Sequence, residues 1–533
     1  MQRQNGWLIS ILLISMSNTI LKIFMQKRNV RAILRVSNTL FLSVIAMTVN
    51  YLIIFMLTPY ITTYLGTEAY GFVSLAKTVS NYGIIITGCL NTYAARYITV
   101  EFHNKNYKKA NIYFSTVVVA NLGMLAIVFV CSLFFIFKLQ LFIRIPNELV
   151  HDVKVLFALD ILNYMLIAIA NTFTVAAYIR NRLDKFEIIK LLSYLAEATV
   201  LVVLFWNLPP KVYYVGVGLL VSTTVLGILN YSLCKKETPE LSVRIKDYSW
   251  NAVKDLVLSG VWNSINSVGN LLNSGLDLWV SNLMLSAVSM GQLSIVKTVS
   301  TILSTIEQLI SRPFQPYLLK NYSEKNISGL LKIFKLEIKV SGFVCNMVTT
   351  ALICFGTAYY SLWTPGQDIN LLYSITIITV IGFMIEGMVQ PLLFIYTLTL
   401  KNRIPCYATI VSGLLNVISM YVLLKCTNLG LLAVVGTTTV LGFINYLIFT
   451  PLYTSKCLNV KLSTFYPSIS RVALSEMVIF VVVRFIFRAF VPNTWIELFV
   501  YIVIMTMVSL PIYAICVLNK KEWTLILKYV RKK

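Results

Sequence analysis

Charged side chains are scarce in this chain: Asp, Glu, Lys and Arg make up 12% of its 533 residues, whereas 58% are hydrophobic. Soluble domains carry about twice that share of charge. Apolar stretches of about 20 residues, long enough to cross a bilayer, recur along the sequence. The composition therefore predicts a polytopic membrane protein and excludes a soluble globular one.

Metal-binding and catalytic patterns are also missing. The nine cysteines form no CxxC pair and no zinc-ligand spacing, and the two histidines, His103 and His151, lie in separate loops. The sequence contains no P-loop, HExxH, GxSxG or GxGxxG motif, so we expect neither ATP hydrolysis nor a common catalytic mechanism. We predict a transporter without catalytic residues, cofactor or metal, and not an enzyme.

The apolar stretches give fourteen predicted transmembrane helices. We expect an all-α integral membrane protein with two six-helix lobes, related by an internal repeat, and two additional C-terminal helices. The tenth helix is expected to break around Gln390–Pro391. The expected spans are 38–57, 72–95, 112–136, 155–178, 188–206, 212–234, 256–281, 291–311, 336–360, 371–397, 405–424, 429–450, 470–490 and 495–517.

The net charge of +24 is distributed unevenly between the loops of the two faces. With these spans, 35 Lys and Arg residues fall on the face that carries both termini, and seven fall on the opposite face. This asymmetry follows the positive-inside rule, which predicts cytoplasmic N- and C-termini. Basic loops attract anionic lipid headgroups, so membrane lipids are the expected partners of this charge, and nucleic acid is not.

The spans and loops divide the chain into five expected regions. Residues 1–37 form a cytoplasmic N-terminal segment, in which Met25 is an alternative start of translation. Residues 38–234 and 256–450 form the two lobes, which a cytoplasmic linker at 235–255 joins. Residues 451–533 supply the two additional helices and a basic C-terminal tail.

A repeated segment with a lysine in each copy supports this division. Tyr70–Ser80 (YGFVSLAKTVS) is echoed 220 positions later by Met290–Ser300 (MGQLSIVKTVS), and six of the last ten positions are identical. Internal repetition is typical of transporters whose substrate site lies between two related halves. Because a charge in a membrane helix is costly, Lys77 and Lys297 are the leading candidates for a binding site.

Each repeated lysine begins a stripe of polar or small residues, given an advance of 100° per residue along a helix. Such faces would lack hydrogen-bond partners in lipid, so they predict the wall of a hydrated cavity. Two other interpretations stay open: the lysines snorkel to headgroups, or the polar residues join neighbouring helices. The stripes are Lys77, Asn81, Gly88, Asn91 and Ala95 in the first copy, and Lys297, Thr301, Ser304, Gln308 and Ser311 in the second.

Further candidates lie on the seventh and tenth helices. Asn270 belongs to a polar face of the seventh helix, and Asp277 on that helix is a candidate partner of Lys297 or a site for a proton or sodium ion. Glu386, near the expected break in the tenth helix, is a second candidate for ion coupling. A structural salt bridge or a helix–helix hydrogen bond is an equally good explanation of either acid.

Two blocks of the sequence resemble the Wzx-type polysaccharide flippases. Thr58–Lys77 (TPYITTYLGTEAYGFVSLAK) and Tyr93–Phe102 (YAARYITVEF) are similar to the first loop and second helix of that family. Trp262–Asn282 (WNSINSVGNLLNSGLDLWVSN) and the Met290–Ser300 segment are similar to its helices seven and eight. The resemblance extends from about Asn38 to Tyr453 and is one of pattern, since it includes no strict catalytic signature.

That family belongs to a superfamily with the MATE exporters and the lipid II flippases. The resemblance implies two lobes in a V that rock between inward-open and outward-open states. It implies that an undecaprenyl-pyrophosphate-linked oligosaccharide is flipped across the bacterial cytoplasmic membrane, with polysaccharide polymerases and glycosyltransferases as partners. At Lys77 and Lys297 it implies contact with the pyrophosphate, and Arg96 and Arg312 are the nearest additional cations.

Three other functions fit parts of the pattern. A MATE-like cation or drug antiporter would share the fold but would favour a cavity rich in carboxylates. A non-transporting scaffold for polysaccharide enzymes would depend on its cytoplasmic loops and not on the lysines. A membrane polymerase is disfavoured by the short loops of the outer face, the longest of which runs from about Phe137 to Lys154.

Overall fold

The computed structural model describes residues 30–488, 490–519 and 522, and all regular elements in this part of the chain are helices. The fourteen predicted spans are helical over most of their length, which confirms the all-α membrane fold. The alternative start at Met25 and most of the predicted segment 1–37 lie outside the described residues, as does most of the basic C-terminal tail.

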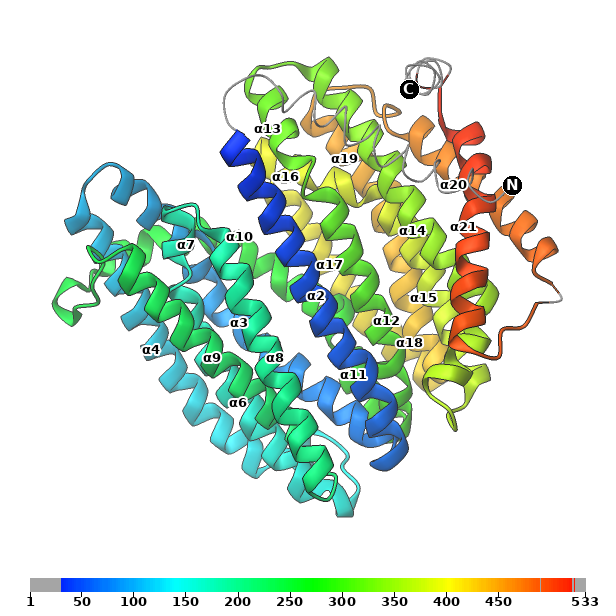
Figure 1. Cartoon of the computed structure of the whole chain (residues 1–533), viewed down its shortest axis with the longest axis horizontal. Helices are drawn as coiled ribbons and strands as arrows, with labels where there is room; N and C mark the ends of the chain where they lie inside the picture. Colours follow the sequence, from blue (N-terminus) through cyan, green and yellow to red (C-terminus); the bar gives the residue numbers. More distant parts are fainter. Residues whose placement is uncertain (1–29, 489, 520–521, 523–533) are drawn as a thin grey trace.

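The first half of the chain forms the helices drawn from blue to green on the left of Figure 1. Among the described residues α2 covers Val30–Tyr64, so it includes the whole predicted span 38–57. The bounds are α2 Val30–Tyr64, α3 Thr67–His103, α4 Tyr107–Phe137, α5 Leu139–Phe142, η1 Asn147–Leu149, α6 Val150–Thr172, α7 Val175–Ile179, α8 Leu183–Asn207 and α9 Tyr214–Glu237.

The second half repeats this order with more interruptions and ends in two helices, α20 and α21, that pack on α14. The bounds are η2 Ile245–Asp247, α10 Trp250–Asn270, η3 Leu271–Gly275, α11 Asp277–Met284, α12 Ala287–Ser311, α13 Gln315–Ser323, α14 Ile327–Trp363, α15 Ile369–Val389, η4 Gln390–Leu393, α16 Phe394–Thr399, α17 Arg403–Cys426, α18 Leu431–Phe443, η5 Ile444–Phe449, α19 Thr450–Cys457, α20 Tyr466–Ile486 and α21 Trp495–Val517.

The internal repeat is visible in the helix bounds. α4 begins at Tyr107 and α14 at Ile327, and α8 begins at Leu183 and α17 at Arg403, which is the same offset of 220 residues in both cases. α7 and α16 end at the same offset, at Ile179 and Thr399. The sequence repeat around the lysines therefore extends to the whole arrangement of helices.

One repeated dipeptide, Lys105-Asn106 and Lys325-Asn326, has a structural role. Both lysines adopt a left-handed backbone conformation, with φ of 60° and 56°. Each asparagine then caps the next helix: Asn106 Oδ1 accepts a hydrogen bond from the backbone N–H of residue 109 at 3.2 Å, and Asn326 Oδ1 accepts one from that of residue 329 at 2.9 Å. Such a cap satisfies a helix-end donor, so this part of the repeat preserves a turn.

α3 and α12 cross in direct contact at the repeated glycines. A Cβ atom at Gly291 would lie 2.1 Å from the carbonyl oxygen of Thr67, and a Cβ atom at Gly71 would lie 2.8 Å from the Gly291 nitrogen. Small residues let two membrane helices approach this closely. Beside the crossing, the hydroxyl oxygens of Tyr70 and Thr298 are hydrogen-bonded at 2.6 Å. Equivalent residues of the two repeats thus meet each other.

The largest apolar core surrounds this crossing and joins the two halves. Phe72 of α3 and Ile295 of α12 are completely buried in it. At its edge, Trp363 stacks on Phe55 of α2 with ring centroids 5.5 Å apart, and its indole N–H donates to the Phe55 carbonyl at 2.8 Å. Because helix association in a membrane depends on close packing and interhelical hydrogen bonds, this core holds the halves together at one end.

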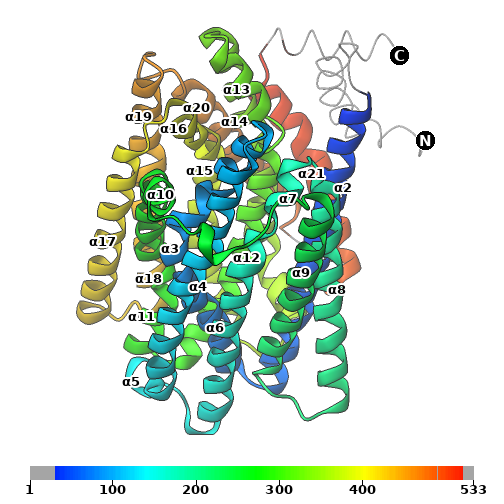
Figure 2. The ribbon, with the colours of Figure 1, turned by 90° about the vertical axis from the view of Figure 1, so that its left-hand side faces the viewer.

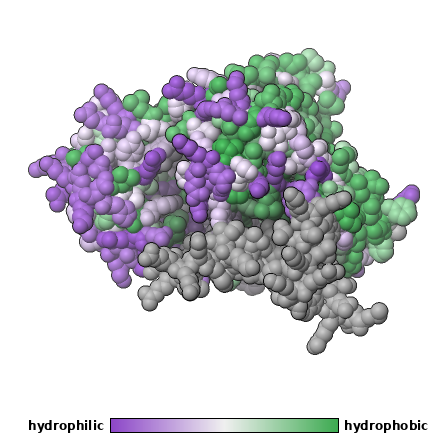
Figure 3. Space-filling model, turned by 90° about the horizontal axis from the view of Figure 1, so that it is seen from above, coloured by the Kyte–Doolittle hydropathy of each residue, from purple (hydrophilic) through white to green (hydrophobic). Residues whose placement is uncertain are grey.

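Away from this core the two halves splay apart. In Figure 1, helices α4 to α9 lean away from α12 to α21 toward the end that carries α7 and α13, and α2 runs between the two groups. α10 packs against α3 of the first half and α17 of the second, which lie close to it in Figure 2. The view onto the splayed end in Figure 3 shows gathered hydrophilic residues, in accord with the basic loops predicted for one face.

Eleven helical segments of the described chain are long and apolar enough to cross a membrane. The other three predicted spans form α3, α10–α11 and α20, which fall short of this apolar composition. α3 carries the Lys77 stripe, and α10 carries the asparagine-rich face. Helices of this polarity require neighbours that shield them from lipid.

We expect the splayed, basic face to be cytoplasmic. In a variant without native cysteines, a membrane-impermeant thiol reagent should label Leu208→Cys in intact cells and spare Lys246→Cys. Both side chains are exposed in the structure, so both should react once the cells are opened. Labelling of Lys246→Cys in intact cells would reverse the predicted orientation.

Gly291→Ala should force α3 and α12 apart, because the added methyl group would overlap the Thr67 carbonyl. We expect the protein to lose about 1–3 kcal/mol of stability, measured as a lower melting temperature in detergent. Gly123→Ala in α4 is the matched control, since an added Cβ there meets no atom within 4 Å and alanine favours a helix. Equal melting temperatures for the two variants would contradict the close crossing.

Candidate functional site

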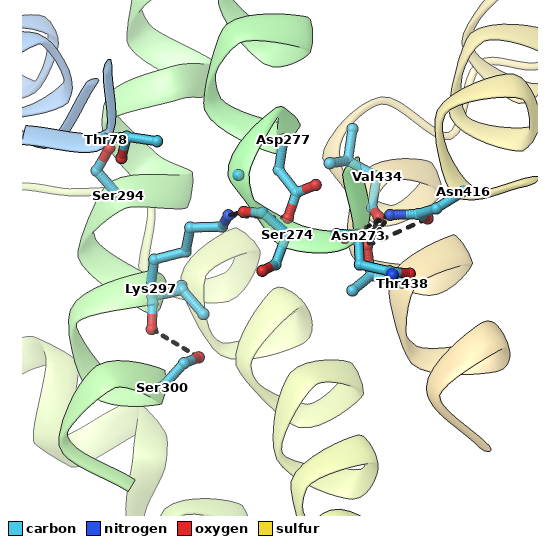
Figure 4. Close-up of polar contacts among 12 residues, drawn as sticks. Thr78, Asn273, Ser274, Asp277, Ser294, Lys297, Ser300, Asn416, Val434 and Thr438 are labelled. Atoms are coloured by element: carbon cyan, nitrogen blue, oxygen red, sulfur yellow. Dashed lines mark hydrogen bonds and ion pairs between the residues drawn. The ribbon is translucent and has the colours of Figure 1, made fainter. Parts of the chain in front are cut away.

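Lys297 extends from α12 to a turn where the seventh helix changes its hydrogen-bond pattern (Figure 4). Residues Leu271–Gly275 form a π-helical turn here, inside the predicted span 256–281. A π turn leaves carbonyl groups without their α-helical partners. The Ser274 carbonyl accepts a hydrogen bond from Lys297 Nζ, and the Gly275 carbonyl accepts one from the hydroxyl of Tyr82 in α3 at 2.6 Å. Both repeated helices therefore hold this turn.

Asp277 supplies the counter-charge of Lys297. Its Oδ2 lies 2.9 Å from Lys297 Nζ, and 6% of the aspartate side chain is exposed, compared with 27% of the lysine side chain. The predicted pairing of these two residues is confirmed. The second carboxylate oxygen, Oδ1, has no hydrogen-bond partner among the described residues. The lysine is thus neutralised by one acid and one carbonyl group while part of it remains accessible.

Lys77, at the equivalent point of the first repeat, has different counter-charges. It is half-buried on α3 and interacts electrostatically with Asp160 of α6 and Glu197 of α8, both of which are buried. Asp160 is held loosely, because neither of its carboxylate oxygens has a hydrogen-bond partner in the part of the chain that the structure describes. Both acids lie near enough to interact with this lysine electrostatically, and no ion pair links it to either of them in the described part of the chain.

The two repeats share the lysine but not the acids. At the 220-residue offset, Val380 and Val417 stand in place of Asp160 and Glu197. In the other direction, Leu57 stands in place of Asp277. A residue needed only to fold the repeated unit would be expected in both copies. The acids therefore mark chemistry that each repeat acquired separately around a shared cation.

The predicted polar stripes have mixed roles. Asn91 is half-buried and exchanges two hydrogen bonds with Asn121 of α4, at 2.9 and 3.4 Å, so it joins two helices. Thr301 donates to the Lys297 carbonyl of its own helix. The remaining stripe and helix-seven candidates are accessible: Asn81, Asn270, Thr301 and Gln308 are exposed, and Ser304 is half-buried.

Arg96 and Arg312 are exposed, far along the chain from the lysines. With a rise of 1.5 Å per residue, Arg96 lies about 28 Å beyond Lys77 and Arg312 about 22 Å beyond Lys297. Both arginines therefore lie toward the basic face. A phosphate held by either lysine would not reach them, so any contact with the same substrate must involve a different part of it.

Glu386 lies where the tenth helix breaks, as the sequence predicted. α15 ends at Val389, and a 3-10 turn covers Gln390–Leu393. Glu386 Oε1 accepts a hydrogen bond from the Tyr446 hydroxyl at 2.7 Å, and its carboxylate interacts electrostatically with Glu307 of α12. Two acids from two helices thus approach each other inside the second half.

The sequence analysis missed an amide network beside the π turn, visible in Figure 4. Asn416 Nδ2 donates to the Asn273 carbonyl at 2.5 Å and to Thr438 Oγ1 at 3.1 Å, and Ser412 Oγ donates to Asn273 Oδ1 at 2.9 Å. Asn416 is the single amide of the apolar helix α17, and Thr438 belongs to a run of three threonines in α18, so periodicity along one helix did not link them. Comparing the two repeats would have singled them out, because the first copy has Ala196 in place of Asn416 and Gly218 in place of Thr438.

The described residues contain no cluster of three or more His, Cys, Asp or Glu that could hold a metal ion. The arrangement provides two partly accessible cations on the helices that cross at Gly71 and Gly291. Lys297 forms an ion pair with Asp277, and Lys77 lies near two buried acids. If another anion takes the place of Asp277 beside Lys297, the buried Asp277 carboxylate loses its partner and needs a proton or a second cation.

Two helical repeats that meet at a glycine crossing define a membrane transporter fold. The inward-facing structure of a multidrug resistance MATE family transporter of the MOP superfamily has a TM-score of 0.62 to this structure, at 15% identity over 80% of this chain and 99% of its own. The lipid II flippase MurJ, in an inward closed conformation, also has a TM-score of 0.62, at 14% identity over 91% of this chain and 98% of its own.

The sequence comparison identifies the family. The model of the family described as polysaccharide biosynthesis protein matches residues 36–321, more than half of the chain, and the chain belongs to that family. EpsK of Bacillus subtilis (strain 168), an uncharacterized membrane protein, is 26% identical over 417 residues, which cover 78% of this chain and 82% of EpsK. The family match confirms the predicted resemblance to polysaccharide biosynthesis proteins, and the two solved structures show the shared fold.

Asp277→Asn should lower the melting temperature, because it removes the carboxylate that neutralises Lys297. Lys297→Gln should also lower it, since a buried carboxylate would remain, and the double variant should recover most of the loss. We expect single losses below the about 3–5 kcal/mol typical of fully buried pairs, because the lysine is partly solvated.

Glu101→Gln is the control for this double-mutant cycle. It breaks an ion pair of 2.7 Å in which 51% of the Lys109 side chain is exposed, so it should cost at most about 1 kcal/mol. Purely additive losses in the Asp277/Lys297 double variant would show that the two side chains do not stabilise each other.

Proposed function

We propose that this protein is a flippase that carries an undecaprenyl-pyrophosphate-linked oligosaccharide across the bacterial cytoplasmic membrane for the synthesis of a surface polysaccharide. The observation that carries the proposal is the pair Lys77 and Lys297. The two lysines occupy equivalent positions on α3 and α12. Lys297 forms an ion pair with Asp277, and Lys77 interacts electrostatically with two buried acids. Membership of the polysaccharide biosynthesis family supports a lipid-linked glycan as the substrate.

The physical task is to move a pyrophosphate and its sugars through about 30 Å of hydrocarbon. A fixed cation in a shielded path lowers the cost of the phosphate charges. Lysine suits this task because its ammonium group is a compact charge that binds phosphate without the rigid two-point geometry of arginine. Asp277 remains beside Lys297 when no substrate is bound, so the empty path contains no unpaired buried cation.

The two lobes, residues 38–234 and 256–450, would alternate between their states by rocking about the Gly71–Gly291 crossing. The splayed end of the described structure is the basic face, so this arrangement corresponds to an opening toward the cytoplasm. The MATE neighbours include both an inward-facing and an outward-facing conformation. That the same fold adopts both supports the rocking motion as the transport step.

Asp277 and Glu386 are the proposed residues of ion coupling. Asp277 loses its partner when a phosphate binds Lys297, so a proton or cation would stabilise the released carboxylate. Glu386 lies close enough to Glu307 to interact electrostatically, and two neighbouring carboxylates favour a shared proton or cation. Each acid would thereby link the arrival of a cation to a change in helix packing.

The proposed orientation places both termini and the linker 235–255 in the cytoplasm. The substrate would enter from the face where glycosyltransferases assemble it and leave toward the face where a polymerase uses it. These enzymes are therefore the proposed partners, and the basic loops are the surfaces nearest to the cytoplasmic ones.

A MATE-like cation or drug antiporter is the second candidate, and the buried acids Asp160 and Glu197 favour it. An antiporter would need these carboxylates more than the lysines. Loss of drug resistance upon Asp160→Asn, with glycan export unchanged, would support the antiporter and oppose the flippase.

Lys77→Ala or Lys297→Ala should abolish glycan export while leaving the amount of protein in the membrane unchanged. Lys→Arg should retain part of the export, and Lys→Glu should be worst, because a negative charge would repel the phosphates in a site of low dielectric constant. Export of surface glycan and protein abundance should be measured in the same cells.

Lys332→Ala is the matched control, since this lysine is exposed near the start of α14 on the basic face. It should leave export unchanged. If the repeated lysines only snorkel to headgroups, alanine would be tolerated at both positions. Normal export by an abundant Lys77→Ala/Lys297→Ala variant would therefore reject the pyrophosphate site.

A further inference from the structure

The second half of the chain contains a polar pocket of about 290 Å³, close to the lower limit of small-molecule sites. It lies between the end of α12, the start of α14 and the break that precedes α16. We call it the α12–α16 pocket. Phe394 and Pro391 form part of its apolar side. Its polar lining consists of Gln308, Ser311, Arg312, Gln315, Glu337, Gln390 and Thr397.

Two prolines create the walls of this pocket. Pro313 follows the end of α12, whereas α3, the equivalent helix, continues unbroken. Pro391 has no N–H to donate to the Gly387 carbonyl one helical turn earlier. The Ser341 hydroxyl donates to that carbonyl instead, at 2.6 Å. The break that positions Gln390 is therefore stabilised by its own hydrogen bond.

Two acceptor atoms in the pocket lack partners. Glu337 is 1% exposed, and its Oε2 has no hydrogen-bond partner among the described residues; the same is true of Gln390 Oε1. A buried acceptor without a donor destabilises a protein. The Ser311 hydroxyl also lies in the lining, close enough to interact with the Glu337 carboxyl group. The pocket therefore offers acceptor oxygens that this hydroxyl, water or a ligand with hydroxyl groups can satisfy.

The fold itself does not require these polar side chains. At the 220-residue offset, the first repeat has Gly88, Ala95, Val117 and Ala170 in place of Gln308, Gln315, Glu337 and Gln390. The same helical framework thus forms with small or apolar residues at all four positions. The polar set was gained or kept in one repeat only, which indicates a role in binding.

The chemistry of the lining selects the ligand. The unpartnered oxygens of Glu337 and Gln390 need donors, while Arg312 and the amides of Gln308 and Gln315 also offer donors. A group that both donates and accepts at adjacent positions is a sugar hydroxyl. A phosphate, which accepts only, would face the Glu337 carboxylate. A metal cation would face the guanidinium of Arg312.

The position of the pocket fits a sugar of the transported headgroup. Gln308 is eleven residues beyond Lys297 on the same helix, which corresponds to about 16 Å toward the basic face. We propose that the α12–α16 pocket binds one pyranose of the glycan, through its hydroxyl groups, while Lys297 binds the pyrophosphate. This inference rests on the proposed function for the identity of the larger molecule, but its sugar-binding chemistry is independent of the lysines.

The test is binding of methyl glycosides to the full-length protein in detergent, followed by saturation-transfer NMR at millimolar concentrations. The probes are the methyl glycosides of glucose, galactose, N-acetylglucosamine and N-acetylgalactosamine, and inorganic pyrophosphate is titrated separately. At least one glycoside should bind. Glu337→Gln and Gln390→Ala should each weaken it about tenfold or more, because each removes an acceptor, while pyrophosphate binding should be unchanged.

Glu476→Gln is the matched control. Glu476 is a buried acid of the same half with one unpartnered oxygen, but it contacts Thr350 between α14 and α20 and lines no part of the pocket. It should leave glycoside binding unchanged. Melting temperatures of all variants separate loss of binding from loss of folding.

The outcomes distinguish the two proposals. Lys297→Ala should abolish pyrophosphate binding and spare the glycoside. Glycoside binding without any pyrophosphate binding would reject the flippase site and leave the pocket standing. No glycoside binding to the parent protein, or equal binding by the Glu337→Gln and control variants, would reject the pocket. Glycoside binding that appears only with added Mg²⁺ or Ca²⁺ would assign the pocket to a cation instead.

Discussion

The cost of a cation inside a membrane is the constraint on which this structure depends. Lys77 and Lys297 lie in helices that lipid would not tolerate alone, so the chain must provide a counter-charge and a shielded surface for each. Lys297 obtains its counter-charge from Asp277 and a carbonyl group of the π turn. Tyr82 of the other repeated helix, α3, donates a hydrogen bond to the same turn. The position of the seventh helix and its approach to α3 thus follow from the need to neutralise one side chain.

The two repeats share their packing contacts and helix caps but differ in the polar residues around them. The glycine crossing, the Lys-Asn caps and the lysines themselves are present in both halves. The acids around the lysines differ, and the asparagine network and the α12–α16 pocket occur with their polar residues in the second half only. In a protein built from two repeats, comparing the two copies therefore distinguishes residues that bind a ligand from residues that pack the helices, and the comparison needs no second protein.

Hydropathy and charge predicted the helices well because membrane spans are set by length and apolar content. The break at Gln390–Pro391 was also predictable, since proline removes a backbone donor. The π turn was not, because Leu271–Gly275 contains no proline and its altered pattern is stabilised by side chains from α3 and α12.

Lys297 and Asp277 were placed together correctly. Asn91, assigned to the stripe of Lys77, is hydrogen-bonded to Asn121 of α4. Periodicity along one helix does not predict such a contact between two helices. The partners of Lys77 were missed for the same reason: they come from α6 and α8.

The ion pair of Lys297 and Asp277 also affects how much charge moves across the membrane potential during transport. A neutral pair that stays with the protein moves no net charge when the halves rearrange without cargo. With cargo bound, the charge that crosses the membrane field would be that of the phosphates. Each elementary charge moved through 100 mV corresponds to about 2.3 kcal/mol, and a negative cell interior drives anions outward. In the proposed orientation, voltage would act on the loaded protein far more than on the returning empty one, which gives the transport cycle a direction.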